Sequence, residues 1–248
     1  MKKMNYFKVL LFLVTVTMIS CVEDSTGGVS SVTSYPEISV QGDATVFIEQ
    51  GSTYEDAGAI SMAGDAVLET TITYGTGAYT ESPFGTEVAD KYTITYSALN
   101  EDGFAGNALR DVWVVPPTSD MVTSIEGLYT AATQRAPDFV PSDQYDGLTY
   151  VTISKTGDST YALSHAIGGY YDMGRGYGSG YAALGAVITA NDIATNDFTA
   201  TQAVFPIWGN TVDITEFTVD AASKSITFTG DGNFGNGTFK VQLTQVQP

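Results

Sequence analysis

From residue 36 onward, apolar and polar side chains alternate along short segments of the chain. The clearest segment is 92–98, where Tyr92, Ile94, Tyr96 and Ala98 fall on one side and threonines on the other. A period of two is typical of a β-strand with one buried face. This alternation and the abundance of β-branched and aromatic residues predict further strands at 38–40, 45–48, 67–73, 110–115, 128–133, 150–155, 161–165, 183–189, 212–219, 225–229 and 238–244.

Two adjacent prolines, Pro116 and Pro117, divide these strands into two sets. Neither proline can donate a hydrogen bond to a neighbouring strand, so the preceding strand must end there. We therefore expect an all-β chain with a β-sandwich at 36–116, a linker at 117–124 and a second antiparallel β-sandwich or β-barrel at 125–248. The best candidate for a helical turn is 119–125.

Residues 1–20 have the pattern of an export signal. Three lysines precede an apolar run at 9–19, which is too short to span a bilayer and is followed by polar residues. The segment Met-Ile-Ser-Cys at 18–21 resembles a bacterial lipobox, in which the cysteine is acylated, for example with palmitate. We therefore expect Cys21 to be lipidated and 21–35 to form a flexible tether. Ordinary signal-peptide cleavage that leaves a free thiol is the alternative.

Two acidic residues, Glu23 and Asp24, follow Cys21 after Val22. Acidic residues at this place resemble the surface-export signal of Bacteroidetes lipoproteins. The resemblance implies a protein anchored in the outer membrane that faces the cell exterior. We expect it to contact the membrane through its lipid anchor only.

The mature chain is strongly acidic. Beyond residue 20, seven Lys and Arg stand against 28 Asp and Glu, a net charge of −21. Such a charge repels nucleic acid, which we exclude as a partner. Strongly anionic polymers are disfavoured in the same way, unless a cation bridges them.

Few residues are suited to catalysis or metal binding. A histidine-based triad would have to use His165, the only histidine, with a serine brought close by the fold, but its place on a predicted strand favours packing or a surface position. Most acidic residues fall in turns or in the tether, which argues against paired catalytic carboxylates. Asp231 lies among oxygen ligands suited to calcium, but without a recurring ligand spacing. We therefore expect no enzymatic activity, no cofactor and no metal.

Segments 36–38, 51–59, 92–98 and 110–114 resemble the bacterial immunoglobulin-like modules of surface proteins. The resemblance implies an immunoglobulin-like β-sandwich at 36–116. Such modules mostly act as spacers, so it also implies presentation of the second domain rather than chemistry. The sequence departs from the family at 61–65, where three extra residues intervene.

The second half carries two segments, 125–129 and 168–178, that look like the C-terminal domains of small lipoproteins encoded with polysaccharide-uptake systems in Bacteroidetes. The resemblance implies a non-catalytic surface protein that binds a polysaccharide or oligosaccharide for uptake. The alternative is an adhesion or accessory protein that contacts an outer-membrane transporter or another surface protein.

The segment 168–181, GGYYDMGRGYGSGY, combines six glycines with four tyrosines. Sugar C–H faces pack on aromatic rings, while the sugar hydroxyls bond to polar groups. The alternative is that these tyrosines fill the core or cover exposed backbone, with the glycines at bulges. Trp208 lies between predicted strands and is a second loop aromatic, whereas Trp113 on a strand is expected in the core. The candidate ligand contacts are Tyr170, Tyr171, Arg175, Tyr177, Tyr181 and Trp208.

Overall fold

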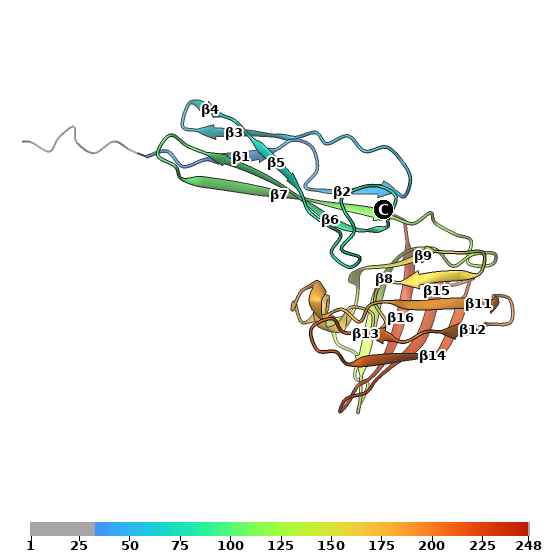
Figure 1. Ribbon diagram of the computed structural model, residues 1–248. Helices are drawn as coiled ribbons and strands as arrows, with labels where there is room; N and C mark the ends of the chain where they lie inside the picture. Colours follow the sequence, from blue (N-terminus) through green and yellow to red (C-terminus); the bar gives the residue numbers. More distant parts are fainter. Residues whose placement is uncertain (1–32, 248) are drawn as a thin grey trace, which may run out of the picture.

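The computed structural model describes residues 33–247 and contains two β domains (Figure 1). An elongated N-terminal module carries the C-terminal domain at one of its ends. The predicted export signal, Cys21 and most of the predicted tether lie outside the described residues. Within 33–247, no helix is long and apolar enough to cross a membrane.

The N-terminal module is a sandwich of two sheets. One sheet has the order β1 (Glu37–Val40), β3 (Ala59–Ala63), β4 (Ala66–Leu68), and the other has the order β2 (Thr45–Glu49), β7 (Ala105–Val115), β6 (Asp90–Leu99), β5 (Thr71–Tyr74). Strand β2 runs parallel to β7, and the other pairs are antiparallel. Tyr92, Ile94 and Tyr96 are fully buried between the sheets, as their alternation with threonine predicted.

Two details of this module differ from the expected strands. The single strand expected at 67–73 is two strands, β4 and β5, because the chain leaves one sheet at Glu69 and joins the other at Thr71. Strand β3 was not predicted from the sequence. Its apolar residues follow one another without strict alternation, and only Ser61 is fully buried.

The C-terminal domain is one nine-stranded antiparallel sheet that curls around its core, rather than two facing sheets. Its two ends approach each other, since an isolated bridge pairs Leu184, just before β11, with Val204 of the last strand, β13. The strands in sheet order are β12 (Asp197–Ala200), β11 (Ala186–Asp192), β10 (Thr160–Leu163), β9 (Leu148–Lys155), β8 (Gly127–Arg135), β16 (Thr238–Val246), β15 (Ser225–Gly232), β14 (Thr211–Asp220) and β13 (Ala203–Val204).

The helical turns of the described residues are short and lie in the C-terminal domain. The helical turn expected at 119–125 is absent, because the Asp120 carboxylate accepts hydrogen bonds from the N–H groups of Val122 and Thr123 and so stabilises a turn. The helical segments that do occur are η1 (Asp143–Tyr145), η2 (Tyr170–Gly174) and η3 (Ser179–Tyr181).

The two domains share an apolar interface. Trp113 and Val115 at the end of β7 pack with Leu128 of β8 in one buried cluster. The ring of Tyr150 lies 5.2 Å from Trp113 and 5.4 Å from Phe47, both in the N-terminal module. Trp113 is therefore buried, as expected, but between the two domains rather than in the centre of one.

Residues 117–124, between the domains, pack against the C-terminal domain. Met121 is buried in its core, and Gln245 and Lys224 donate hydrogen bonds to the carbonyl groups of Ser119 and Asp120. These contacts hold the segment along its length.

Candidate functional site

The glycine- and tyrosine-rich segment 168–181 is folded into two tight turns. Gly169 has a φ of +79°, and a Cβ at this position would collide with the side chain of Met173. The π-helical turn η2 follows, with the N–H groups of Gly174 and Arg175 bonded to the carbonyls of Gly169 and Tyr170. Glycine is favoured where the chain enters this turn, because an L side chain at this positive φ would be strained and would also have to displace the end of the Met173 side chain.

This turn places two of the predicted ligand contacts in the core. Tyr170 is 5% exposed and Tyr171 is 8% exposed. Both rings contact Phe239 of β16, and Tyr145 of η1 stacks on Tyr170 at 4.1 Å. For these two tyrosines the structure agrees with the alternative of core packing, so they are not free to form a sugar platform.

The other three aromatic candidates lie together at the surface. Tyr177 is 49% exposed, Trp208 is 43% exposed and Tyr181 is partly buried. The Tyr181 ring lies 4.9 Å from Trp208 and 5.4 Å from Tyr177, and the latter two rings are 6.4 Å apart. We call Tyr177, Tyr181 and Trp208 the exposed aromatic cluster. Two loops distant in sequence therefore supply one surface, supported below by the buried ring of Tyr171, 4.9 Å from Trp208.

Two arginines lie beside these tyrosines. The guanidinium of Arg175 is 5.6 Å from the centre of the Tyr170 ring, and that of Arg135 is 5.8 Å from the same ring. Arg175 was a sequence candidate, whereas Arg135 and Tyr145 were not. They lie at the end of β8 and in η1, far from residues 168–181 in sequence, and no local pattern connects them to this site.

The arginines change the acidity of the tyrosine between them. Burial raises the pKa of Tyr170, but hydrogen bonds from Tyr145, Arg175 and Arg135 and the positive charge of Arg175 lower it by more, so the pKa lies below the usual tyrosine value. A lowered pKa means that the phenolate is stabilised. The potential at this point is therefore positive, in a chain that is strongly acidic overall.

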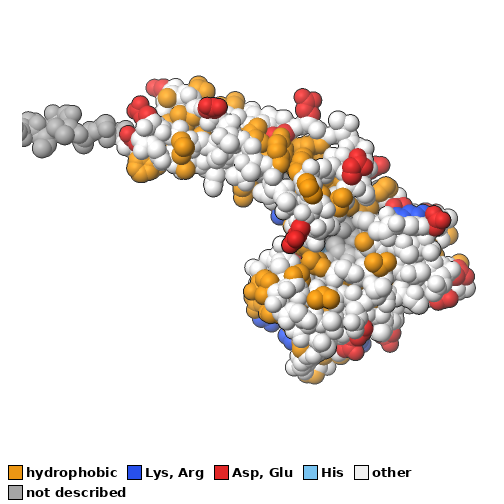
Figure 2. All heavy atoms as spheres, in the orientation of Figure 1, with side chains coloured by type: hydrophobic (Ala, Val, Ile, Leu, Met, Phe, Trp, Pro, Cys, Tyr) orange, Lys and Arg blue, Asp and Glu red, His pale blue; other side chains and the backbone are white. Residues whose placement is uncertain are grey.

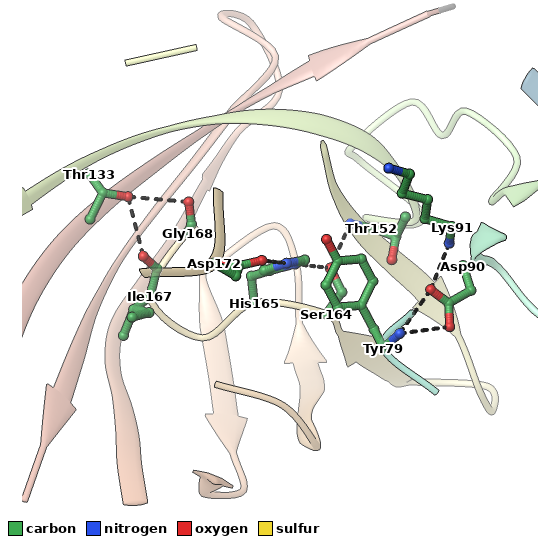
Figure 3. A network of polar contacts seen from close by, with 10 residues as sticks. All are labelled: Tyr79, Asp90, Lys91, Thr133, Thr152, Ser164, His165, Ile167, Gly168 and Asp172. Atoms are coloured by element: carbon green, nitrogen blue, oxygen red, sulfur yellow. Dashed lines mark hydrogen bonds and ion pairs between the residues drawn. The ribbon is translucent and has the colours of Figure 1, made fainter. Parts of the chain in front are cut away.

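A buried polar network lies where the two domains meet (Figure 3). His165, which directly follows β10, is fully buried. Its Nδ1 is 2.6 Å from Ser164 Oγ, and its Nε2 is 2.8 Å from Asp172 Oδ2. An ionised carboxylate only accepts hydrogen bonds, so Nε2 carries a proton, and a neutral ring accepts the Ser164 hydroxyl at Nδ1.

These three residue types are those of a nucleophilic triad, but their surroundings differ from those of an activated serine. Ser164 Oγ also accepts a hydrogen bond from the N–H of Thr152, at 2.9 Å. The Tyr79 ring of the N-terminal module packs edge-on against His165 at 4.4 Å. The histidine is thus packed, as expected, and it is also the centre of the contact between the domains.

Tyr79 brings its own polar group to this network. Burial and the nearby negative charges of Asp172 and Asp90 raise the pKa of the Tyr79 hydroxyl well above its usual value. The hydroxyl therefore remains protonated at physiological pH. A cavity of about 200 Å³ lies next to the network, lined mainly by apolar atoms from both domains and by the Ser164 side chain.

Asp231, considered above among possible calcium ligands, is already bonded to a neighbouring side chain. Asp231 lies on β15 and accepts a hydrogen bond from the Thr238 hydroxyl at 2.6 Å. Among residues 33–247, no three acidic, histidine or cysteine side chains are grouped as a metal site would require.

Comparisons with known proteins agree with this architecture. A family model for a C-terminal domain matches residues 118–245, and a model described as a bacterial surface protein, Ig-like domain, matches residues 38–114. The crystal structure of the lipoprotein BT2262 from Bacteroides thetaiotaomicron is similar, with a TM-score of 0.62 and 24% sequence identity over 85% of this chain and 100% of that one. At this identity the likeness shows the fold alone. A search of curated protein sequences gave no match.

Proposed function

We propose that this chain, which belongs to the family defined by the C-terminal domain matched at residues 118–245, is a non-catalytic surface lipoprotein that binds a polysaccharide or oligosaccharide. Its surface location is supported by the Ig-like module of bacterial surface proteins and by the lipoprotein with the same fold. The proposed anchor is an acylated Cys21 in the outer membrane, with both domains facing the cell exterior.

The observation that carries the binding proposal is the exposure of Tyr177 and Trp208. Large aromatic rings are normally buried, and here two of them are about half exposed on one surface, with Tyr181 between them. A sugar ring that covers about 100 Å² of this apolar surface gains roughly 2.5 kcal/mol before ordering costs. Affinity at a single site is therefore expected to be weak, and many copies on one cell would strengthen it through avidity.

Affinity electrophoresis of the mature protein against a panel of soluble polysaccharides tests this proposal. At least one polymer should retard the protein, and Trp208→Ala or Tyr177→Ala should abolish most of that retardation. Tyr74→Ala is a matched control, because Tyr74 is 47% exposed but lies in the N-terminal module. Retardation that is unchanged in both cluster variants would refute the proposed site.

The non-catalytic part of the proposal rests on the surroundings of Ser164, whose oxygen already accepts the N–H of Thr152. A fluorophosphonate probe, which labels activated serines, should leave the protein unlabelled. Labelling that disappears in Ser164→Ala would overturn this part and identify an acyl-transfer site.

A further inference from the structure

We propose that the ligand of the exposed aromatic cluster carries a carboxylate, as uronic and sialic acids do, and that Arg175 binds this group. The inference rests on the proposed function and adds the chemical class of the sugar. It begins with the unusual charge balance around this site.

Lys and Arg are scarce in the described part of the chain, and two of them form ion pairs. The ion pairs formed by Lys and Arg among residues 33–247 use Lys91 and Arg110 as the basic partners. Arg135 and Arg175 take part in none of them. On the face shown in Figure 2, acidic side chains are spread over both domains, whereas Lys and Arg form only small patches. Two arginines that lie together without a carboxylate are therefore distinctive here.

Arg175 is exposed and largely available to a ligand. Its side chain makes one hydrogen bond in the described part of the chain, a long one of 3.4 Å from Nη2 to the Tyr170 hydroxyl. Cation–π contacts with Tyr170 and Tyr145, at 5.6 and 6.0 Å, hold the guanidinium against the protein surface. The remaining N–H groups can bind a ligand without a large loss of side-chain entropy.

Arg135 places a second positive charge at the same point. Its Nε donates to the carbonyl of Asn236 at 2.8 Å, which fixes the side chain next to Tyr170 and Tyr171. The Tyr177 ring stacks on Tyr171 at 6.1 Å, which connects the exposed aromatic cluster to the tyrosines beside the two arginines. The site thus combines guanidinium and phenol groups, all of which can donate hydrogen bonds.

A carboxylate is the ligand group that matches this set of donors. It accepts hydrogen bonds only, and its two oxygens fit the parallel N–H groups of a guanidinium. The net negative charge of the chain opposes a dense polyanion, but charges more than about 8 Å apart are largely screened at physiological salt. The nearby arginines therefore attract the carboxylate of a single acidic sugar. The acidic surface further away repels the rest of the polymer, and so favours polymers with a low density of negative charge.

The test compares acidic polysaccharides with carboxyl-reduced forms of the same polymers, in affinity electrophoresis with the mature protein. Hyaluronan supplies acidic sugars separated by neutral ones, which suits this limit on charge density, whereas polygalacturonate, alginate and polysialic acid supply them at higher density for comparison. We expect at least one of them to bind, and reduction of its carboxylates to weaken binding about tenfold or more. Arg175→Gln should cause a similar loss and should make the protein insensitive to carboxyl reduction.

Lys155→Gln is the matched control, because it removes one exposed positive charge elsewhere in the same domain. It should leave binding within about twofold of wild type. An equal loss in Lys155→Gln would show attraction to overall charge and would overturn the role of Arg175.

The outcomes separate this inference from the proposed function. Binding of a neutral or carboxyl-reduced polymer that depends on Trp208 but not on Arg175 would keep the proposed function and refute the acidic ligand. Binding of dextran sulfate, with none of the carboxylates bound, would refute the carboxylate in favour of a sulfate. Failure of every polymer, acidic and neutral, would refute both proposals.

Discussion

The two neighbouring tyrosines Tyr171 and Tyr177 should respond very differently to truncation. Tyr171 is 8% exposed and packs against Tyr170, Phe205, Trp208 and Phe239, with ring centres 4.9 to 6.0 Å apart. Truncation of this ring leaves a cavity in a close-packed core. Tyr171→Ala should therefore lower the free energy of unfolding by about 3–5 kcal/mol, the usual range for a buried large aromatic.

Tyr177 is 49% exposed, so only about half of its side chain is buried by folding. Truncation removes the stabilisation from that buried half alone. A buried aromatic covers about 150–250 Å², and half of that at about 25 cal/mol per Å² gives roughly 2–3 kcal/mol as an upper limit. The actual loss should be nearer to about 1 kcal/mol, because no internal cavity forms and the unfolded chain also buries part of the ring.

Thermal melting followed by far-ultraviolet circular dichroism distinguishes these values. For a protein of this size, each kcal/mol corresponds to about 2–4 °C in Tm. Tyr171→Ala should lose about 10 °C or more and Tyr177→Ala only a few degrees, while Tyr171→Phe, which keeps the ring, should stay close to wild type. Equal losses in the two alanine variants would refute the division of segment 168–181 into a packed part and an exposed part.

Three further predictions concern other parts of the chain. Cys21→Ala should leave unprocessed precursor and prevent labelling with radioactive palmitate; normal labelling would exclude lipidation at this residue. In the N-terminal module, burial raises the pKa of Asp56, but hydrogen bonds from Tyr96 and Tyr54 and the charge of Arg110 lower it by more, so this pKa lies below the usual aspartate value. Stability from Asp56 is therefore present above about pH 4 and lost as the pH falls through the lower folded-state pKa, so Asp56→Asn should flatten the acid limb of a Tm–pH curve. Limited proteolysis should leave 117–124 intact in the wild type, and rapid cleavage there would contradict the observed contacts of Met121.

The all-β fold was predictable because strand alternation is a local property. Tyr92, Ile94 and Tyr96 are buried because alternate residues of a strand lie on the same face of the sheet. This alternation can be recognised in the sequence without knowing which distant residues pack against the strand. Curling of nine strands into one sheet was not predictable in the same way. It depends on which strands pair, such as β8 with β16, and a strand's alternation does not name its partner.

The candidate site was predictable only in part, for a related reason. Composition identified Tyr177, Tyr181 and Trp208, and the fold brings them together. The same composition gave no means to distinguish Tyr177 from Tyr171, because their exposure is decided by the π-helical turn after Gly169. Arg135 was missed since it reaches the site from another strand.

The polar network at His165 shows why the N-terminal module is more than a loose spacer. Tyr79 of that module packs on a histidine fixed by Ser164 and Asp172, and Asp172 belongs to the same η2 turn that buries Tyr170 and Tyr171. The turn that supports the exposed aromatic cluster on one side is therefore bonded, through Asp172, to the domain interface on the other. Trp113 and Tyr150 also pack together at this interface. The N-terminal module therefore fixes the direction in which the exposed aromatic cluster faces, relative to the long axis of the module. A rigid connection of this kind would let the tether position an entire two-domain unit, rather than a binding domain that moves freely at the end of a spacer.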